Sequence, residues 1–308
     1  METNCEGCAG CCVDWRALAD HPAPDGTGRR EPLDDAYDLV PLTRDEVAAF
    51  VDDGLGDALV PRLFEPADGD DVVPIDGYDL AAVDGLRWLP QSDDEHRTPV
   101  EPFDAAPRWL PTCVFLDPDT LQCRIHGTDR YPETCASYPG HNLRLGRETE
   151  CERVEAAFGG ERLVDDAVPE DLPQPQFGPT ALGSTVFAHP DPEALTGSVE
   201  RLATAGRTAG VGSDRGEREG ASPPTAADRA TFVGAAVGSR PMSLSVNRDR
   251  MGEARDAVEN ADSWVGRALD EWADRAAAAG GVGAPVDDAE TLARDVEERR
   301  GAPETPGW

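Results

Sequence analysis

The sequence contains no lysine, so arginine supplies all 28 of its basic side chains, against 61 aspartates and glutamates. Proteins that bind nucleic acid through its phosphates need clustered positive charge on one face or along one groove. A formal charge of -33 without any basic stripe does not meet that requirement. We therefore expect no nucleic-acid partner.

Long apolar runs are also missing. No segment approaches the roughly 18 uninterrupted apolar residues that a membrane helix needs. The first residues, Met1 to Cys5, have neither the basic start nor the apolar stretch of a secretory signal. These absences predict a soluble, cytoplasmic protein with no membrane partner.

The motifs of several enzyme classes do not occur. The sequence has no Walker loop, no Gly-rich dinucleotide fingerprint and no Ser/His/Asp constellation. His126 and His141 lie between cysteines, but a lone histidine in a polar turn is more often a solvated side chain than a ligand. The sequence therefore indicates no catalytic residue and no residue that binds an organic cofactor.

The excess of acidic residues has a general physical explanation. The carboxylates repel one another in dilute buffer, but in molar salt the Debye length falls to about 3 Å and the repulsion is screened. The composition resembles that of a protein from a salt-in halophile, such as a halophilic archaeon. We prefer this interpretation to an acidic surface that binds a basic partner.

Against these absences stands a dense cluster of thiols. Cys5, Cys8, Cys11 and Cys12 follow a C-x2-C-x2-C-C pattern within eight residues. Thiolate sulfur is the soft ligand selected by zinc, copper(I) and iron–sulfur clusters. In a reducing cytosol, clustered cysteines are more often metal ligands or redox groups than structural disulfides, although the even total of eight keeps disulfides open.

Four more cysteines follow about a hundred residues later: Cys113, Cys123, Cys135 and Cys151. The apolar run Val114–Leu116 predicts a strand and Asp117–Asp119 predicts a turn, so a hairpin is expected to bring Cys113 and Cys123 together. Cys135 and Cys151 are expected to lie near the same end of this hairpin.

The spacing does not identify the metal. Three cysteines at x2 spacing resemble the first three ligands of a bacterial ferredoxin cluster. Eight cysteines also divide evenly into two tetrahedral zinc sites of four thiolates, and the adjacent Cys11 and Cys12 can serve two centres. We prefer an iron–sulfur cluster to zinc as the cofactor, with disulfides or a redox switch as further alternatives.

We expect the two cysteine groups to share at least one centre. A metal bound by both would close a loop of roughly a hundred residues and contribute to folding stability. The terminal segment offers little apolar surface in the sequence, so removal of the metal is expected to release the residues before Pro32.

Several motifs together resemble the YkgJ-type cysteine-cluster family, whose domains are described as zinc- or iron-chelating. They are the C-x2-C-x2-C-C run, Cys113-Val-Phe-Leu-Asp117 with the following Cys123, and Pro132-x2-Cys135-x2-Tyr138-Pro139. The resemblance covers residues 1–160. It implies metal-ligand roles for Cys5, Cys8, Cys11, Cys12, Cys113, Cys123 and Cys135, with Cys151 at the place of a later cysteine that many members have.

The chain departs from the family pattern at three positions. His126 replaces an aromatic residue, Tyr131 interrupts an Arg-Pro pair, and Ala136 replaces a frequent arginine. Flagellin lysine methylases carry a similar cysteine cluster, but nothing in this sequence resembles their methyl-donor site.

The second half of the chain differs in character. Apolar residues recur at three- and four-residue intervals from Met251 to Ala276, which predicts an amphipathic helix or a broken pair. Such a stripe either packs onto the rest of the protein or docks a protein partner. We expect an α+β fold, with an irregular cysteine-cluster domain over 1–160, a mostly helical extension over 161–308, and a flexible linker around 206–224.

Two classes of function follow. In the first, the protein is a metal-binding module that holds an iron–sulfur cluster or zinc for structure, metal handling or electron transfer. In the second, the metal serves a protein-modifying or redox enzyme whose substrate site the sequence does not locate. An enzyme would need a pocket with convergent polar groups beside the thiols.

The charge generates the first testable prediction. Transfer from molar to millimolar salt is expected to lower the thermal unfolding midpoint or precipitate the protein, because unscreened carboxylate repulsion then opposes the compact state. Thermal unfolding followed by circular dichroism over a salt series measures this effect. An unchanged midpoint would exclude the interpretation of the acidity as salt adaptation.

Overall fold

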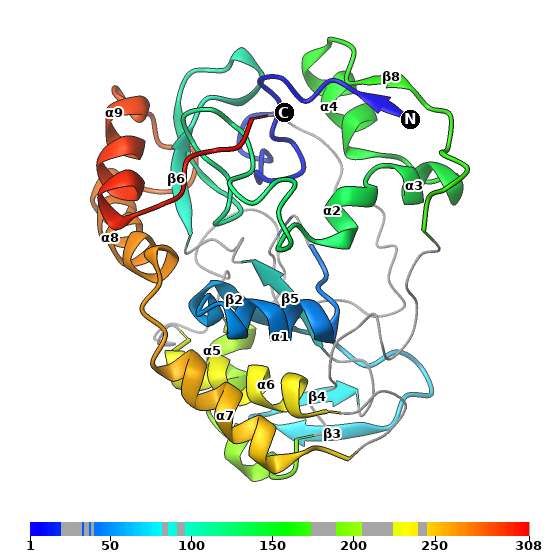
Figure 1. Ribbon diagram of the computed structural model, residues 1–308, viewed down its shortest axis with the longest axis vertical. Coiled ribbons are helices and arrows are strands. Elements are labelled where there is room, and N and C mark those ends of the chain that lie inside the picture. The colour runs from blue at the N-terminus through cyan, green and yellow to red at the C-terminus, as the bar shows by residue number, and fades with distance from the viewer. Residues whose placement is uncertain are drawn as a thin grey trace. The chain divides into compact units, whose positions relative to one another are not determined.

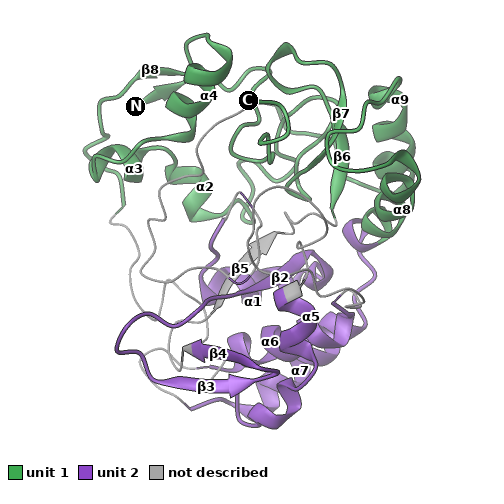
Figure 2. Cartoon of the chain, turned by 180° about the vertical axis from the view of Figure 1, so that it is seen from behind, with its two compact units in different colours: residues 1–23, 96–175, 267–308 green, residues 24–95, 176–266 purple. Residues whose placement is uncertain are grey.

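The computed structural model describes residues 1–19, 33, 37, 40–81, 86–90, 96–173, 189–204, 224–239 and 245–307 (Figure 1). The fold is mixed α+β, as the sequence predicted, with small two-stranded antiparallel sheets and a mostly helical C-terminal half. Contacts divide the chain into two compact units, each built from separated segments (Figure 2).

Unit 1 comprises residues 1–23, 96–175 and 267–308, and its ranges include all eight cysteines. Its strands pair as β1 with β8 and β6 with β7. The elements are β1 (Glu2–Thr3), β6 (Arg97–Val100), a 3-10 turn (Pro102–Asp104), β7 (Arg108–Pro111), α2 (Glu133–Ser137), α3 (Gly140–Arg144), α4 (Glu150–Phe158), β8 (Leu163–Asp165), most of α8 (Trp264–Ala279), α9 (Ala289–Ala293) and a π-helical turn (Arg294–Glu298).

Unit 2 comprises residues 24–95 and 176–266. Helices α1, α6 and α7 pack on one another, and α5 and α6 contact β2. The elements are α1 (Arg44–Asp52), a 3-10 turn (Gly56–Ala58), β2 (Leu59–Leu63), β3 (Val72–Ile75), β4 (Tyr78–Ala81), β5 (Leu86–Pro90), a second 3-10 turn (Pro192–Leu195), α5 (Ser198–Thr204), α6 (Ala226–Gly238) and α7 (Arg248–Glu259).

Local sequence signals place several elements correctly. The spacing Thr43-x-x-Glu46 is typical of a capping box. The two residues form one at the start of α1, because each side chain accepts a hydrogen bond from the other residue's backbone N–H. The short, mostly apolar stretches near 71–75 and 86–89 form β3 and β5. The expected linker at 206–224 lies almost wholly outside the described residues.

The apolar stripe of the second half belongs to a broken pair of helices, α7 and α8. Most of its members are buried: Ala254, Val258, Val265, Ala268, Trp272 and Ala276. The stripe is therefore used in packing within the chain, which is the simpler of its two interpretations.

The C-terminal segment packs within the unit that contains the cysteines. Trp272 on α8 makes an edge-to-face contact with Trp109 on β7, with ring centroids 5.8 Å apart. The Trp109 N–H donates to the Ala284 carbonyl at 3.0 Å, and its carbonyl accepts from the Gly283 N–H at 2.8 Å. The compact units therefore do not coincide with the expected division into 1–160 and 161–308, because residues after 267 complete the core around β7.

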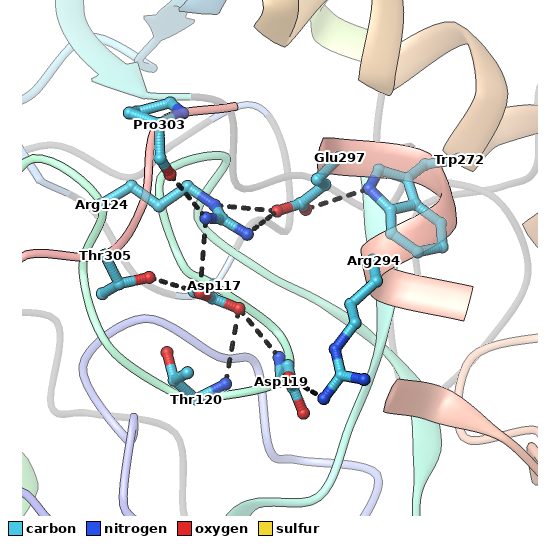
Figure 3. Close-up of polar contacts among 9 residues, drawn as sticks. All are labelled: Asp117, Asp119, Thr120, Arg124, Trp272, Arg294, Glu297, Pro303 and Thr305. Atoms are coloured by element: carbon cyan, nitrogen blue, oxygen red, sulfur yellow. Dashed lines mark hydrogen bonds and ion pairs between the residues drawn. The ribbon is translucent and has the colours of Figure 1, made fainter. Parts of the chain in front are cut away.

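A buried charge network fastens the same segment to the predicted cysteine hairpin (Figure 3). The Arg124 guanidinium donates to the Glu297 carboxylate at 2.7 and 2.9 Å and to the Pro303 carbonyl at 2.8 Å. Asp117 lies 3.3 Å from Arg124 and accepts a hydrogen bond from the Thr305 hydroxyl. Trp272 Nε1–H donates to the other Glu297 oxygen at 3.2 Å. Both carboxylate oxygens of Glu297 therefore accept hydrogen bonds.

Glu297 nevertheless carries a large desolvation cost. Burial raises the pKa of its carboxyl from 4.5 to about 7, and Arg124 only partly opposes the shift. Removal of Arg124 would leave two buried carboxylates, Glu297 and Asp117, without their shared cation. Loss of one partner from a buried pair costs much more than the pair itself contributes.

We predict that Arg124→Met lowers the free energy of unfolding by about 3–5 kcal/mol and Glu297→Gln by about 1 kcal/mol. The matched control Arg299→Met removes an exposed pair with Asp295 and should change stability by less than about 1 kcal/mol. Denaturant unfolding in molar salt measures all three. Equal effects of Arg124→Met and Arg299→Met would show that the network does not stabilise the unit.

The same network predicts a pH dependence. Because the folded-state pKa of Glu297 lies above its unfolded value, the folded chain binds this proton more tightly. The stabilisation that this tighter proton binding gives the folded state is fully present below pH 4.5 and is lost as pH rises through about 7. The parent protein should therefore lose stability relative to Glu297→Gln across this interval, and a pH-independent difference would contradict the assignment.

Candidate metal centre

The loop from Cys5 to Cys12 consists of two consecutive tight turns. The Cys8 N–H donates to the Cys5 carbonyl at 3.1 Å, and the Cys12 N–H donates to the Ala9 carbonyl at 2.8 Å. Gly7 adopts φ +62°, a conformation that glycine reaches without the steric cost of a side chain. The two turns fold the backbone of the cysteine motif into a compact loop.

The start of this loop is attached to the region around α4 and β8, beside which Figure 1 shows the N-terminus. β1 pairs antiparallel with β8, and the Asn4 N–H donates to the Arg162 carbonyl at 2.7 Å. Arg162 also donates from Nη1 to the Glu6 carbonyl at 2.9 Å. These bonds hold the first residues against a segment about 160 positions later.

The end of the loop is attached to the entrance of the cysteine hairpin. The Cys113 N–H donates to the Cys12 carbonyl at 2.8 Å, and the Asp14 N–H donates to the Pro111 carbonyl at 2.8 Å. Val13 and Thr112 form an antiparallel bridge between them. Two cysteines about a hundred residues apart in sequence are therefore directly hydrogen-bonded through their backbones.

The hairpin itself closes as the sequence predicted, although without the expected strand. Leu116 and Cys123 form an isolated antiparallel bridge, and the Asp117 N–H donates to the Gln122 carbonyl at 2.8 Å. Residues 114–116 form a turn that ends at this bridge. The expectation of a strand at Val114–Leu116 was wrong, because the Leu116 N–H bonds back to the Cys113 carbonyl and curls the backbone.

Cys135 and Cys151 lie on short helices. Cys135 is in α2, and Cys151 is in the first turn of α4, which Thr149 and Glu152 cap reciprocally. Backbone N–H groups and the helix dipole at such an end favour a thiolate over a thiol. Burial acts in the opposite direction, since Cys151 is 8% exposed.

Burial raises the pKa of three thiols. It raises the pKa of Cys8 and of Cys123, and together with the charges of Cys5 and Cys8 it raises the pKa of Cys151 to about 12. Thiols of this kind stay protonated at neutral pH unless a cation is bound, since only the thiolate is a metal ligand.

Two tyrosine phenols lie among the cysteines. Burial, followed by the charges of Cys135, Cys123, Cys12 and Cys11, raises the pKa of Tyr131. Burial and the charge of Cys11 likewise raise the pKa of Tyr138, with a smaller effect of Cys151. The structure thus brings members of both cysteine groups together around each phenol.

The thiols do not, however, meet at a single point. Within the described parts of the chain, no three His, Cys, Asp or Glu side chains are arranged as a ready-made metal site. Cys5 and Cys11 are exposed, and Cys12, Cys113, Cys123 and Cys135 are partly exposed. The segments are adjacent through their backbones, and ligation of a metal would require the cysteine side chains to come closer together. The ligand roles of all eight cysteines stay predictions.

The two histidines between the cysteines have other contacts. His141 Nδ1 lies 3.1 Å from the Ser137 hydroxyl, and its Nε2 lies 2.8 Å from the Pro173 carbonyl. The His126 ring makes an edge-to-face contact with Tyr131, with centroids 4.8 Å apart. These contacts agree with structural roles for both imidazoles.

Aromatic contacts and an ion pair around Trp15, next to the loop, were not predicted from the sequence. Trp15 is fully buried, packs edge-to-face on Phe103 and Phe158, and donates from Nε1 to Glu150. Arg153 pairs with Glu150 at 2.9 Å and lies over the Trp15 ring. The only sequence signal was an aromatic residue three positions after the cluster, and it did not indicate partners more than 80 residues away.

This support changes the expectation that metal loss releases the N-terminus. The described part of that segment, residues 1–19, is held by β1, by the Val13–Thr112 bridge and by the buried Trp15. None of these contacts requires a metal. We now expect the segment to stay protected from protease after chelation.

Among the described residues, no helix is long and apolar enough to cross a membrane.

Gly10 provides a direct test of the contact between the loop and α4. A Cβ atom at this position would lie 2.8 Å from Val154 Cγ2, and Val154 is fully buried on α4. We predict that Gly10→Ala lowers the free energy of unfolding by about 1–3 kcal/mol, because the rigid valine cannot yield. The loss should shrink in a Val154→Ala background.

A matched control is Gly252→Ala in α7, where an added Cβ meets nothing within 4 Å and a helical alanine is expected to stabilise by up to about 1 kcal/mol. Chemical unfolding of the parent, the two single glycine variants, Val154→Ala and the Gly10→Ala/Val154→Ala double variant gives the comparison. Equal signs for Gly10→Ala and Gly252→Ala would show that the loop does not pack on α4 as described.

Comparison with known proteins gives a family but no named relative. No curated protein and no solved structure matches the chain significantly. The resemblance to the YkgJ-type cysteine-cluster family therefore stays a prediction. The sequence profile of one family, described as a family of unknown function, DUF7531, matches residues 1–308. The chain, over its whole length, belongs to the DUF7531 family.

Proposed function

We propose that this protein binds a metal centre through its clustered cysteine thiolates, with an iron–sulfur cluster preferred over zinc. The observation that supports the proposal most directly is the backbone hydrogen bond between Cys113 and Cys12. It joins a C-x2-C-x2-C-C loop to a second group of cysteines, so that thiols from distant segments meet in one unit. A dense set of soft ligands of this kind is typical of zinc and iron–sulfur proteins.

The ligands would be Cys5, Cys8, Cys11, Cys12, Cys113, Cys123, Cys135 and Cys151. When bound, an iron–sulfur cluster supplies one-electron redox chemistry, whereas zinc supplies structural stability. A reducing, cytoplasmic compartment fits thiols that must stay reduced to bind a metal.

The surrounding residues would tune such a centre. Tyr131 and Tyr138 place phenol groups near the thiols, and hydrogen-bond donors around sulfur stabilise thiolate charge. Trp15, Phe103 and Phe158 form an apolar layer beneath the loop, which limits water access from that side. These side chains hold the loop in place and exclude water, and no catalytic step is assigned to them.

The test is anaerobic purification in molar salt followed by metal and acid-labile sulfide analysis. Iron with a similar amount of sulfide and visible absorption is the expected result. Zinc without sulfide would replace the preferred cofactor and keep the function. A folded protein with neither metal, even after anaerobic reconstitution, would refute the proposal.

A matched pair of variants separates ligation from general disturbance of the loop. Cys8→Ser removes a buried thiol and is expected to lose at least half of the bound metal. Glu6→Gln changes an exposed carboxylate in the same segment and should retain all of it. Equal metal contents of the two variants would exclude Cys8 as a ligand.

A further inference from the structure

Cys12 and Cys113 lie opposite each other in a short antiparallel contact. The Cys113 N–H donates to the Cys12 carbonyl at 2.8 Å, one position beyond the bridge between Val13 and Thr112. Cross-strand neighbours in such a contact have Cα atoms about 5.5 Å apart, within the roughly 4.4–6.8 Å that a disulfide spans. The backbone therefore places these two cysteines at a separation that a disulfide can bridge.

The burial of the neighbouring side chains indicates the face on which the two thiols lie. Side chains alternate between the two faces along an extended segment. Val13 and Thr112 are both fully buried, and the Thr112 hydroxyl lies 3.0 Å from the Thr98 hydroxyl. Cys12 and Cys113 are the next residues, and both are partly exposed. The alternation therefore directs both thiols to the face opposite the buried pair.

The backbone around this pair is held by the core of unit 1. The fully buried Trp15 follows the first cysteine by three positions, and β7 ends directly before Thr112. A second thiol held beside the first reacts as an intramolecular group, at a much higher effective concentration than a thiol in solution. Oxidation of one cysteine of the pair should therefore lead to ring closure with the other.

Cys5 and Cys8 form the nearest competing pair, because one tight turn joins them. The Cys8 N–H donates to the Cys5 carbonyl at 3.1 Å. Cys8 is only 8% exposed, however, whereas both members of the cross-strand pair are partly exposed. Thiol–disulfide exchange depends on access to the sulfur, so a small oxidant favours the cross-strand pair.

We propose that Cys12 and Cys113 form a reversible disulfide on contact with a small disulfide oxidant, such as oxidised glutathione. One protein thiolate attacks a sulfur of the oxidant, which gives a mixed disulfide and releases the first small thiol. The second protein thiolate then attacks the protein sulfur of the mixed disulfide and releases the second small thiol. The two protein thiols together lose two electrons and two protons, and the oxidant is reduced to two thiols.

The test uses the metal-free full chain in molar salt, incubated with oxidised glutathione. The remaining thiols are alkylated, and the chain is cut with trypsin without reduction. Because the chain has no lysine, trypsin releases residues 1–16 and 109–124 as the two peptides that contain the pair. A link between these peptides is the expected main product, and dithiothreitol should break it. A main link within residues 1–16, or no link at all, would overturn the proposal.

Serine variants identify the bonded pair, since each of the two peptides carries further cysteines. Cys12→Ser and Cys113→Ser should each lose most of the link between the peptides. The matched controls Cys11→Ser and Cys123→Ser remove another thiol from the same peptides and should keep the link. Equal losses in Cys11→Ser and Cys12→Ser, or in Cys113→Ser and Cys123→Ser, would contradict the assignment.

A second control does not depend on the folding of variants. The parent protein oxidised in denaturant lacks the contact between the two segments, so it should give a mixture of links, including links to the peptides that carry Cys135 and Cys151. The same single link in the folded and the unfolded chain would show that the fold does not direct the disulfide, and would overturn the proposal.

The disulfide would also withdraw two of the eight candidate metal ligands. On the basis of the proposed metal-binding function, the oxidised chain should therefore take up less zinc than the reduced chain in an anaerobic titration. Equal uptake by the two forms would overturn this coupling, whereas the peptide map alone decides whether the disulfide forms.

Discussion

The arrangement of the cysteine unit depends on one backbone hydrogen bond, from the Cys113 N–H to the Cys12 carbonyl. The adjacent Val13–Thr112 bridge and the Asp14–Pro111 bond extend it into a short antiparallel contact. Without this contact, two cysteine-rich segments far apart in sequence would have no fixed relation. Because backbone groups make it, the contact involves none of the thiols of the two segments.

The sequence predicted those features that depend on local chemistry. The capping box at Thr43, the closure of the hairpin at Cys123 and the burial of the stripe through Trp272 follow from short-range spacing. It did not predict the supports that come from distant residues. The pairing of Trp15 with Glu150 and of Arg124 with Glu297 joins positions more than 130 residues apart, and single polar residues in so acidic a chain carry no pairing signal.

Spacing alone singled out all eight cysteines as candidate ligands, and the adjacent Cys11 and Cys12 slightly favoured two zinc sites. These ligand roles stay predictions. Which segments lie beside the cysteine loop is a property of tertiary structure, and the spacing of the cysteines does not contain it. The sequence did not indicate what holds the N-terminal segment, because the apolar partners of Trp15 lie in other segments.

The discontinuous course of unit 1 has a consequence for biosynthesis. Its first 23 residues emerge from the ribosome long before residues 267–308, which supply Trp272 and Glu297. At typical synthesis rates of about 5–20 residues per second, the four N-terminal cysteines wait some tens of seconds for the rest of their unit. During that interval the four cysteines lack the contacts that later segments supply, so unit 1 can be completed only after its last segment has been synthesised.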